Sequence, residues 1–138
     1  MLHMVKLAVG VRDIAHLRQI QAHRLATDPP LRHQTRSFPR RAAEITAGGS
    51  IYWVIAGAIV VRQRITAIIE DRWDDDTACA GLVLDPALVP VAARPTRAFQ
   101  GWRYLQPEAA PADLDSSAPA DGTLPEELRR TLQGLGLL

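Results

Sequence analysis

Arginine is concentrated in one short stretch of the sequence whose chemistry suits an anion. Arg32, Arg36, Arg40 and Arg41 fall within ten residues, around a predicted loop and the start of a short helix. Each guanidinium presents a planar fork of N–H donors that matches a phosphate or a carboxylate, and the backbone N–H groups at a helix start also attract anions. The stretch indicates an anion-binding surface, and the alternative is a basic loop without a ligand.

Aromatic residues lie close to arginine in two further segments. A predicted hairpin contains Tyr52 together with Arg62 and Arg64, and Tyr104 directly follows Arg103. Rings that stack on bases, beside arginine that binds phosphate, are typical of nucleotide and nucleic-acid sites. The predicted phosphate contacts are Arg36, Arg40, Arg41, Arg62, Arg64 and Arg103, and the predicted stacking residues are Tyr52 and Tyr104.

The sequence lacks the signatures of catalysis and of metal binding. It contains no Gly-x-Ser-x-Gly elbow, no phosphate-binding Gly-x-x-x-x-Gly-Lys loop and no Rossmann glycine pattern. His16 and His23 are seven residues apart, whereas a zinc pair on one helix is usually about four apart. We expect no catalytic residue, no metal and no cofactor, and we interpret Cys79, the single cysteine, as a buried inert thiol.

The charge is distributed unevenly along the 138 residues. Residues 1–64 carry a net charge of +7 and residues 65–138 a net charge of −6. A basic half can face an anionic partner, and the alternative is that the two halves neutralise each other in the fold. The longest uncharged apolar run, residues 51–61, is eleven residues long, and a membrane helix needs roughly 20. We expect a cytoplasmic protein that does not enter a membrane.

The elements that would position these residues follow from periodicity and from turn residues. Apolar spacing of three and four predicts a helix over 13–27 with Asp13 as its N-cap. Ala56-Gly57 between two β-rich runs predicts a hairpin of 50–55 with 58–69. A short helix is expected between Phe38-Pro39 and Gly48-Gly49, a loop over 86–95, and further strands over 4–9, 33–37, 79–84 and 97–105.

Alternation along 58–69 divides its side chains between two faces. Ile59, Val61, Gln63 and Ile65 are expected to face inward, and Arg62 and Arg64 outward. The largest rings are expected in the interior because so few aromatics are present. The predicted core is Leu7, Val9, Leu17, Ile51, Trp53, Ile55, Ile59, Val61, Ile65, Leu82, Leu84 and Trp102.

Together these elements predict one α+β domain over residues 1–106. The expected architecture is a small mixed β-barrel or strongly curved sheet of five or six strands, with one main helix and a short second helix. Residues 107–138 form an Ala/Pro/Asp-rich tail, interpreted as a linker or a disordered segment. A capping box at Thr123 and a leucine stripe predict a short helix near 124–133 within that tail.

Several segments together resemble an uncharacterised alphaproteobacterial family, domain of unknown function fourteen-eighty-nine. They are Met4–Gly10, Thr35-Arg36-x-x-Pro39-Arg40-Arg41 leading to Gly49–Ile55, and Leu82–Pro86 leading to Phe99–Leu105. The resemblance covers about residues 3–107 and implies no established activity. The element order is similar to the PUA and ASCH-type small barrels, many of which bind RNA or modified bases. The Gly-x-Lys-x-x-x-Glu signature of ASCH domains is absent here.

The sequence therefore leaves three functional hypotheses. The first is a non-catalytic binding module for RNA or a nucleotide-like anion such as a phosphorylated small ligand. The second is a small enzyme acting on an anionic metabolite, with Asp85 or Glu44 as the acid or base. The third is a protein-interaction adaptor in which the C-terminal helix contacts a protein partner.

Overall fold

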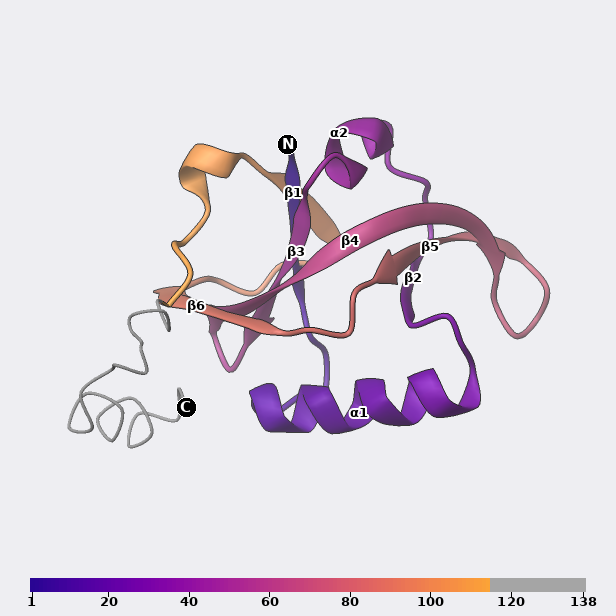
Figure 1. Ribbon diagram of the computed structural model, residues 1–138, viewed down its shortest axis with the longest axis horizontal. Coiled ribbons are helices and arrows are strands. Elements are labelled where there is room, and N and C mark those ends of the chain that lie inside the picture. The colour runs from indigo at the N-terminus through magenta and orange to yellow at the C-terminus, as the bar shows by residue number, and fades with distance from the viewer. Residues whose placement is uncertain (115–138) are drawn as a thin grey trace.

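The computed structural model describes residues 1–114, which form a curled mixed sheet and two α-helices (Figure 1). The helices are α1 (Ile14–Thr27) and α2 (Ala42–Thr46), and a 3-10 turn, η1, spans Pro107–Ala109. The strands are β1 (His3–Leu7), β2 (Arg32–Thr35), β3 (Ser50–Ile55), β4 (Ala58–Arg72), β5 (Ala78–Leu84), β6 (Val89–Pro95) and β7 (Trp102–Leu105).

The strand order is β2-β5-β4-β3-β1-β7, and β6 also pairs with β4. Strands β1 and β3 are parallel, and the other pairs are antiparallel. The long arch of β4 curls the sheet into a half-barrel, with α2 near the start of β1 and α1 near its end (Figure 1). The prediction of an α+β fold with a strongly curved sheet, one main helix and a short second one is confirmed.

The loop predicted over 86–95 is wrong, because most of it is strand β6. Its two prolines, Pro90 and Pro95, argued against a strand, since proline cannot donate to a ladder. Among the seven described strands β6 pairs with β4 alone, and the register of this pair shifts between Ile59 and Val61. An irregular strand at the margin of a sheet is where proline is tolerated. This strand raises the number in the described part of the chain to seven.

The hairpin of β3 and β4 forms as predicted. Both turn residues, Ala56 (φ 53°) and Gly57 (φ 85°), are in the left-handed region, which matches the right-handed twist of the strands that the turn connects. The predicted N-cap is also confirmed, because Asp13 Oδ1 accepts the backbone N–H of His16 at 2.7 Å. Helix α2 begins at Ala42, later than predicted, and β7 begins at Trp102 rather than Arg97.

The two faces of the sheet each carry an apolar cluster. The inner cluster joins α1 and α2 to residues such as Ile51, Trp53 and Ile65, and the outer one contains Tyr52 and Val54. A register shift beside Ile59 places that residue in the outer cluster, although simple alternation predicted the same face as Val61. Such irregularities turn a strand about its own axis and cannot be read from alternation.

Most of the predicted core residues are buried. The prediction that Val9 is in the core is wrong, since its side chain is 83% exposed just after β1 ends. Leu7 and Trp102 are half-buried and pack against the two clusters. Cys79 is buried, as expected of an inert thiol.

The chain continues to pack against β6 beyond the predicted domain boundary at residue 106. Ala92 N–H donates to Ala112 O at 2.8 Å, and Leu114 N–H donates to Pro90 O at 2.9 Å. These bonds run antiparallel to β6, where Val91 and Asp113 form an isolated bridge. The helix predicted near 124–133 lies outside the described residues.

Candidate functional site

The two ends of the strand order, β2 and β7, border an open cleft of about 620 Å³, here called the seam cleft. Curling of the sheet brings these distant strands to one opening. Strand β1 contributes to the cleft beside β7, and the turn after β4 contributes Trp73. The cleft is lined by Lys6, Gln34, Thr35, Arg36, Ser37, Trp73, Gln100, Gly101 and Trp102.

Lys6 and Arg36 make the seam cleft cationic. Lys6 is opposite Trp102 in the β1–β7 register, so the two side chains share a face. Within residues 1–114, the one hydrogen bond of the Lys6 ammonium is to a backbone oxygen, Leu7 O at 3.5 Å, and burial lowers the Lys6 pKa. Arg36 is exposed and forms no ion pair within residues 1–114. In the part of the chain that the structure describes, no acidic side chain lines the cleft.

Two tryptophans and two amides complete the seam cleft. Trp73 is 37% exposed in the turn after β4, and Trp102 is half-buried, with its ring edge-on to Tyr104 at a centroid distance of 4.9 Å. The Gln34 amide is already engaged, because it donates to Asp71 at 3.1 Å and to Arg72 O at 2.9 Å. Gln100 is exposed. The cleft thus combines indole rings, cations and amide groups.

A second cavity of about 240 Å³, here called the helix pocket, lies between α1 and the sheet. Its walls are largely apolar, and its polar residues are Lys6, Gln21, Arg24, Arg32 and His33. The His33 ring is edge-on to Trp53 at 5.3 Å between centroids. Burial lowers the pKa of His33 to about 4, and the charges of Lys6 and Arg24 add to that effect. The imidazole is therefore neutral at pH 7.

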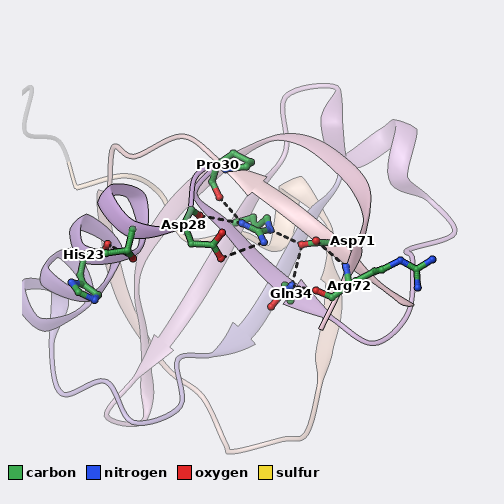
Figure 2. Close-up of polar contacts among 8 residues, drawn as sticks. His23, Asp28, Pro30, Gln34, Asp71 and Arg72 are labelled. Carbon is green, nitrogen blue, oxygen red and sulfur yellow. Dashed lines mark hydrogen bonds and ion pairs between the residues drawn. The ribbon is translucent and has the colours of Figure 1, made fainter. Parts of the chain in front are cut away.

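Arg32 serves the structure rather than a ligand. Its Nε donates to Asp71 Oδ2 at 2.5 Å, and its Nη1 donates to the backbone oxygens of Asp28 and Pro30. Figure 2 shows Asp28 and Pro30 on one side of this cluster and Asp71 with Gln34 on the other. The hydrogen bond from Arg32 lowers the pKa of Asp71. The hydrogen bonds of this cluster connect the C-terminal end of α1 and strand β2 to the C-terminal end of β4.

The structure places the predicted phosphate-binding arginines in separate surroundings. Arg62 is bound by Asp113 through two hydrogen bonds, of 2.7 and 2.8 Å, and also donates to Ser50 Oγ. Tyr52, which pairs with Arg62 in the β3–β4 register, is buried with its ring edge-on to His3. These groups belong to the outer face of the sheet, and the seam cleft does not include them.

Arg41 and Tyr104 are brought together at the start of α2. The Tyr104 hydroxyl accepts the backbone N–H of Arg41 at 3.2 Å, and the guanidinium lies 5.6 Å from the ring centroid. That guanidinium also donates twice to Glu44 at 2.7 Å. The ion pair lowers the Glu44 pKa, which makes this carboxylate a weak base.

Of the remaining predicted arginines, only Arg36 lines the seam cleft. Arg103 lies over the Phe99 ring at 4.5 Å, and Arg40 and Arg64 are exposed. The sequence prediction did not select Lys6, Trp73 or Gln100 for the site, and it assigned Trp102 to the core. Lys6 is the single polar residue of a short apolar run, and a charge inside such a run was the available signal. Nothing local in the sequence marked Trp73.

The acid or base suggested for an enzyme does not reach either cavity. Neither Asp85 nor Glu44 is among the lining residues. Asp85 Oδ1 instead accepts the backbone N–H of Ala87 at 2.8 Å. Within residues 1–114, no group of three or more His, Cys, Asp and Glu side chains is arranged to hold a metal ion.

Comparison with known proteins gives one match. No curated protein and no solved structure matches the chain, so the similarity to PUA and ASCH-type barrels stays a prediction. No helix in the described part of the chain is long and apolar enough to span a membrane. The family match reaches residue 138, so the expectation that the tail is outside the resemblance is wrong. On this match over residues 4–138, the chain belongs to the family described as Protein of unknown function (DUF1489).

Proposed function

We propose that this protein is a non-catalytic binding module for a nucleotide-like anion, which it holds in the seam cleft. One observation carries the proposal. The cleft brings Trp73 and Trp102 together with Lys6 and Arg36, and none of the described residues that line it is acidic. A nucleotide offers the complementary groups, namely a planar base, polar edges and a phosphate.

Each group in the seam cleft complements one part of a nucleotide. Lys6 and Arg36 attract the phosphate, and Arg36 is free to donate in the bidentate geometry that guanidinium allows. The exposed Trp73 ring offers a face for base stacking, worth about 1–3 kcal/mol per base. The Gln100 amide can bond to a base edge. The volume of about 620 Å³ is within the range of about 300–1,000 Å³ that is usual for ligand sites.

A single-stranded RNA is the alternative ligand of the same chemistry. In that case the seam cleft receives one nucleotide, and the exposed Arg40 and Arg64 contact neighbouring phosphates. A mononucleotide is favoured because the cleft groups that bind phosphate, Lys6 and Arg36, lie with the tryptophans in one cavity. Arg41 and Arg62 already hold carboxylates.

The test is titration with AMP, followed by calorimetry and by the indole N–H signals of ¹⁵N-labelled protein. The chain has three tryptophans, and AMP should shift the signals of Trp73 and Trp102 but not of Trp53. Arg36→Gln should weaken AMP binding about tenfold, as loss of a hydrogen bond to a charged group does. Arg64→Gln is the matched control and should leave AMP affinity unchanged.

The RNA alternative and the absence of catalysis are tested in the same samples. Tighter binding of an eight-nucleotide RNA than of AMP, weakened by Arg64→Gln and steeply salt-dependent, would identify RNA as the ligand. Phosphorus NMR should show AMP unchanged after a day with the protein. Consumption of AMP, or shifts confined to Trp53, would contradict the proposal.

A further inference from the structure

The helix pocket has the walls of a binding site for an apolar group. Helix α1 contributes Leu17 and Ile20, and the sheet contributes Trp53 and Leu84. Only Leu17 and Gln21 of the fourteen residues in α1 are buried, so the helix leaves space between itself and the sheet. Its ends are fixed by the Asp13 cap and by the Arg32 cluster, which hold the helix over that space.

Two cationic side chains at the helix pocket have no acidic partner within residues 1–114. Lys6 and Arg24 form no ion pair among the described residues, whereas Arg32 is held by Asp28 and Asp71. Gln21, the other polar residue contributed by the helix, is tied to Gln63 by two hydrogen bonds of 2.9 and 2.7 Å. No acidic side chain of residues 1–114 lines the pocket. The free charge of the pocket is therefore positive.

His33 adds a polar atom whose hydrogen-bonding capacity is unsatisfied among the described residues. Its Nε2 atom is buried and has no hydrogen-bond partner in residues 1–114. Buried polar atoms in native proteins nearly always have a partner, and an exception calls for an explanation such as strain, a chemical role or a bound water or ion. A ligand with an oxygen beside an apolar body would supply that partner.

The volume limits the size of the ligand. A dry cavity of about 150 Å³ is enough to hold benzene, and this pocket measures about 240 Å³. It accommodates one ring or a branched chain of similar size, with one small polar head. A carboxylate suits walls that are mainly apolar better than a phosphate dianion, whose desolvation is more costly.

We propose that the helix pocket binds a small monocarboxylate with a single ring or a branched apolar body. The carboxylate meets Lys6 and Arg24, the apolar body packs against Trp53 and α1, and His33 bonds to a ligand oxygen. This site is separate from the proposed nucleotide function, although Lys6 lines both cavities. The tests therefore use residues that line one cavity only.

The probe is phenylacetate, titrated into the full chain and followed by calorimetry and by the indole N–H signals. Trp53 should shift and Trp73 and Trp102 should not, which is the reverse of the pattern for AMP. Acetate should bind at least about tenfold more weakly because it buries no ring. Phenylacetamide should bind at least about fivefold more weakly because it carries no charge.

Two variants test the assigned contacts. Arg24→Gln should weaken phenylacetate binding about fivefold, and Arg18→Gln, at an exposed position of the same helix, should not change it. Ala8→Leu should reduce binding further by filling the pocket, and its backbone spectrum shows whether it folds. Arg24 is exposed, so its variant folds in either case.

Three results would overturn the assignment. They are no saturable binding of phenylacetate, equal loss of affinity in Arg24→Gln and Arg18→Gln, or equal affinity for phenylacetate and phenylacetamide. Each of these outcomes is independent of AMP binding, because AMP binding is measured by the indole signals of Trp73 and Trp102 and by the Arg36 variant. Failure of one proposal is therefore distinguishable from failure of the other.

Discussion

Trp53 donates its indole N–H to the side-chain oxygen of Gln63 on the neighbouring strand, at 3.1 Å. Gln63 is completely buried, and its amide also donates to Gln21 at 2.7 Å and to Asp85 O at 2.8 Å. Gln21 returns a bond of 2.9 Å to the same Gln63 oxygen. One amide therefore joins α1, β3, β4 and the end of β5 in the interior.

Removing this amide should be costly. Gln63→Leu leaves the Trp53 N–H, the Gln21 amide and the Asp85 carbonyl without their partner, and each unsatisfied buried group costs about 1–3 kcal/mol. We expect a loss of about 3 kcal/mol or more in the free energy of unfolding, measured by urea denaturation. Arg64→Gln, one position along on the exposed face, should change it by less than about 0.5 kcal/mol.

Gly49→Ala should be more damaging than Gly48→Ala. An added Cβ at Gly49 would overlap the carbonyl oxygen of Leu2 and lie 2.5 Å from that of Ile45. Backbone atoms cannot move aside cheaply, and we expect a loss of at least about 3 kcal/mol. An added Cβ at Gly48 would make an ordinary contact with the Met1 side chain at 3.8 Å, but the φ of +101° costs about 1–2 kcal/mol for alanine. Thermal denaturation of both variants gives the order, and the reverse order would contradict this packing.

Stability should fall as the pH falls from 7.5 to 5 because of His33. Its pKa is about 4 in the folded protein against 6.5 ordinarily, so the unfolded chain binds the proton and the folded one does not. The contribution of His33 to the free energy of unfolding is fully present above pH 6.5 and is lost as the pH falls towards 4. The loss between pH 7.5 and 5 is about 2 kcal/mol.

His33→Gln isolates that contribution. Burial also lowers the pKa of His3, so some decline with falling pH should remain in the variant. Urea denaturation at pH 7.5 and at pH 5 should show a smaller difference for His33→Gln than for the wild type. Equal differences in the two proteins would show that the imidazole is not held neutral by its surroundings.

Asp113→Asn should release residues 107–114 with little effect on global stability. Asp113 binds Arg62 through two hydrogen bonds, yet its side chain is 46% exposed. Solvent screening limits such a pair to less than about 1 kcal/mol. Amide hydrogen exchange at Ala92 and Leu114 should become faster, since both N–H groups are bonded across this segment. Asp76→Asn, which removes the exposed partner of Arg72, should leave both rates unchanged.

Local signals predicted much of the fold. The hairpin follows from Ala56-Gly57, and α1 follows from the Asp13 cap and the apolar spacing after it. Strand β6 was missed because its pairing depends on β4, which is distant in the sequence, while its prolines signalled a loop. The prediction that Ile59 shares a face with Val61 was wrong for a related reason, since a register shift depends on the partner strand.

The candidate site was predicted less well than the fold. Arginine content indicated an anion, but the partners Asp113 and Glu44 that occupy Arg62 and Arg41 are set by tertiary packing. Lys6 is on β1 and Trp73 directly follows β4, which is separated from β1 by β3, and the curl of the sheet places both residues at one cleft. Composition therefore indicated the chemistry, and the topology selected the residues.

The position of β1 has a consequence for how the chain folds during synthesis. His3 pairs with Leu105 on one side, and Met4 pairs with Ile51 on the other. Contacts between such distant segments slow folding, because a long loop must close before they form. The ribosome releases the first strand early, yet one of its edges has no partner until β7 has emerged. A nascent chain truncated before Trp102 would expose that edge, and a cell would have to shield it until translation nears its end.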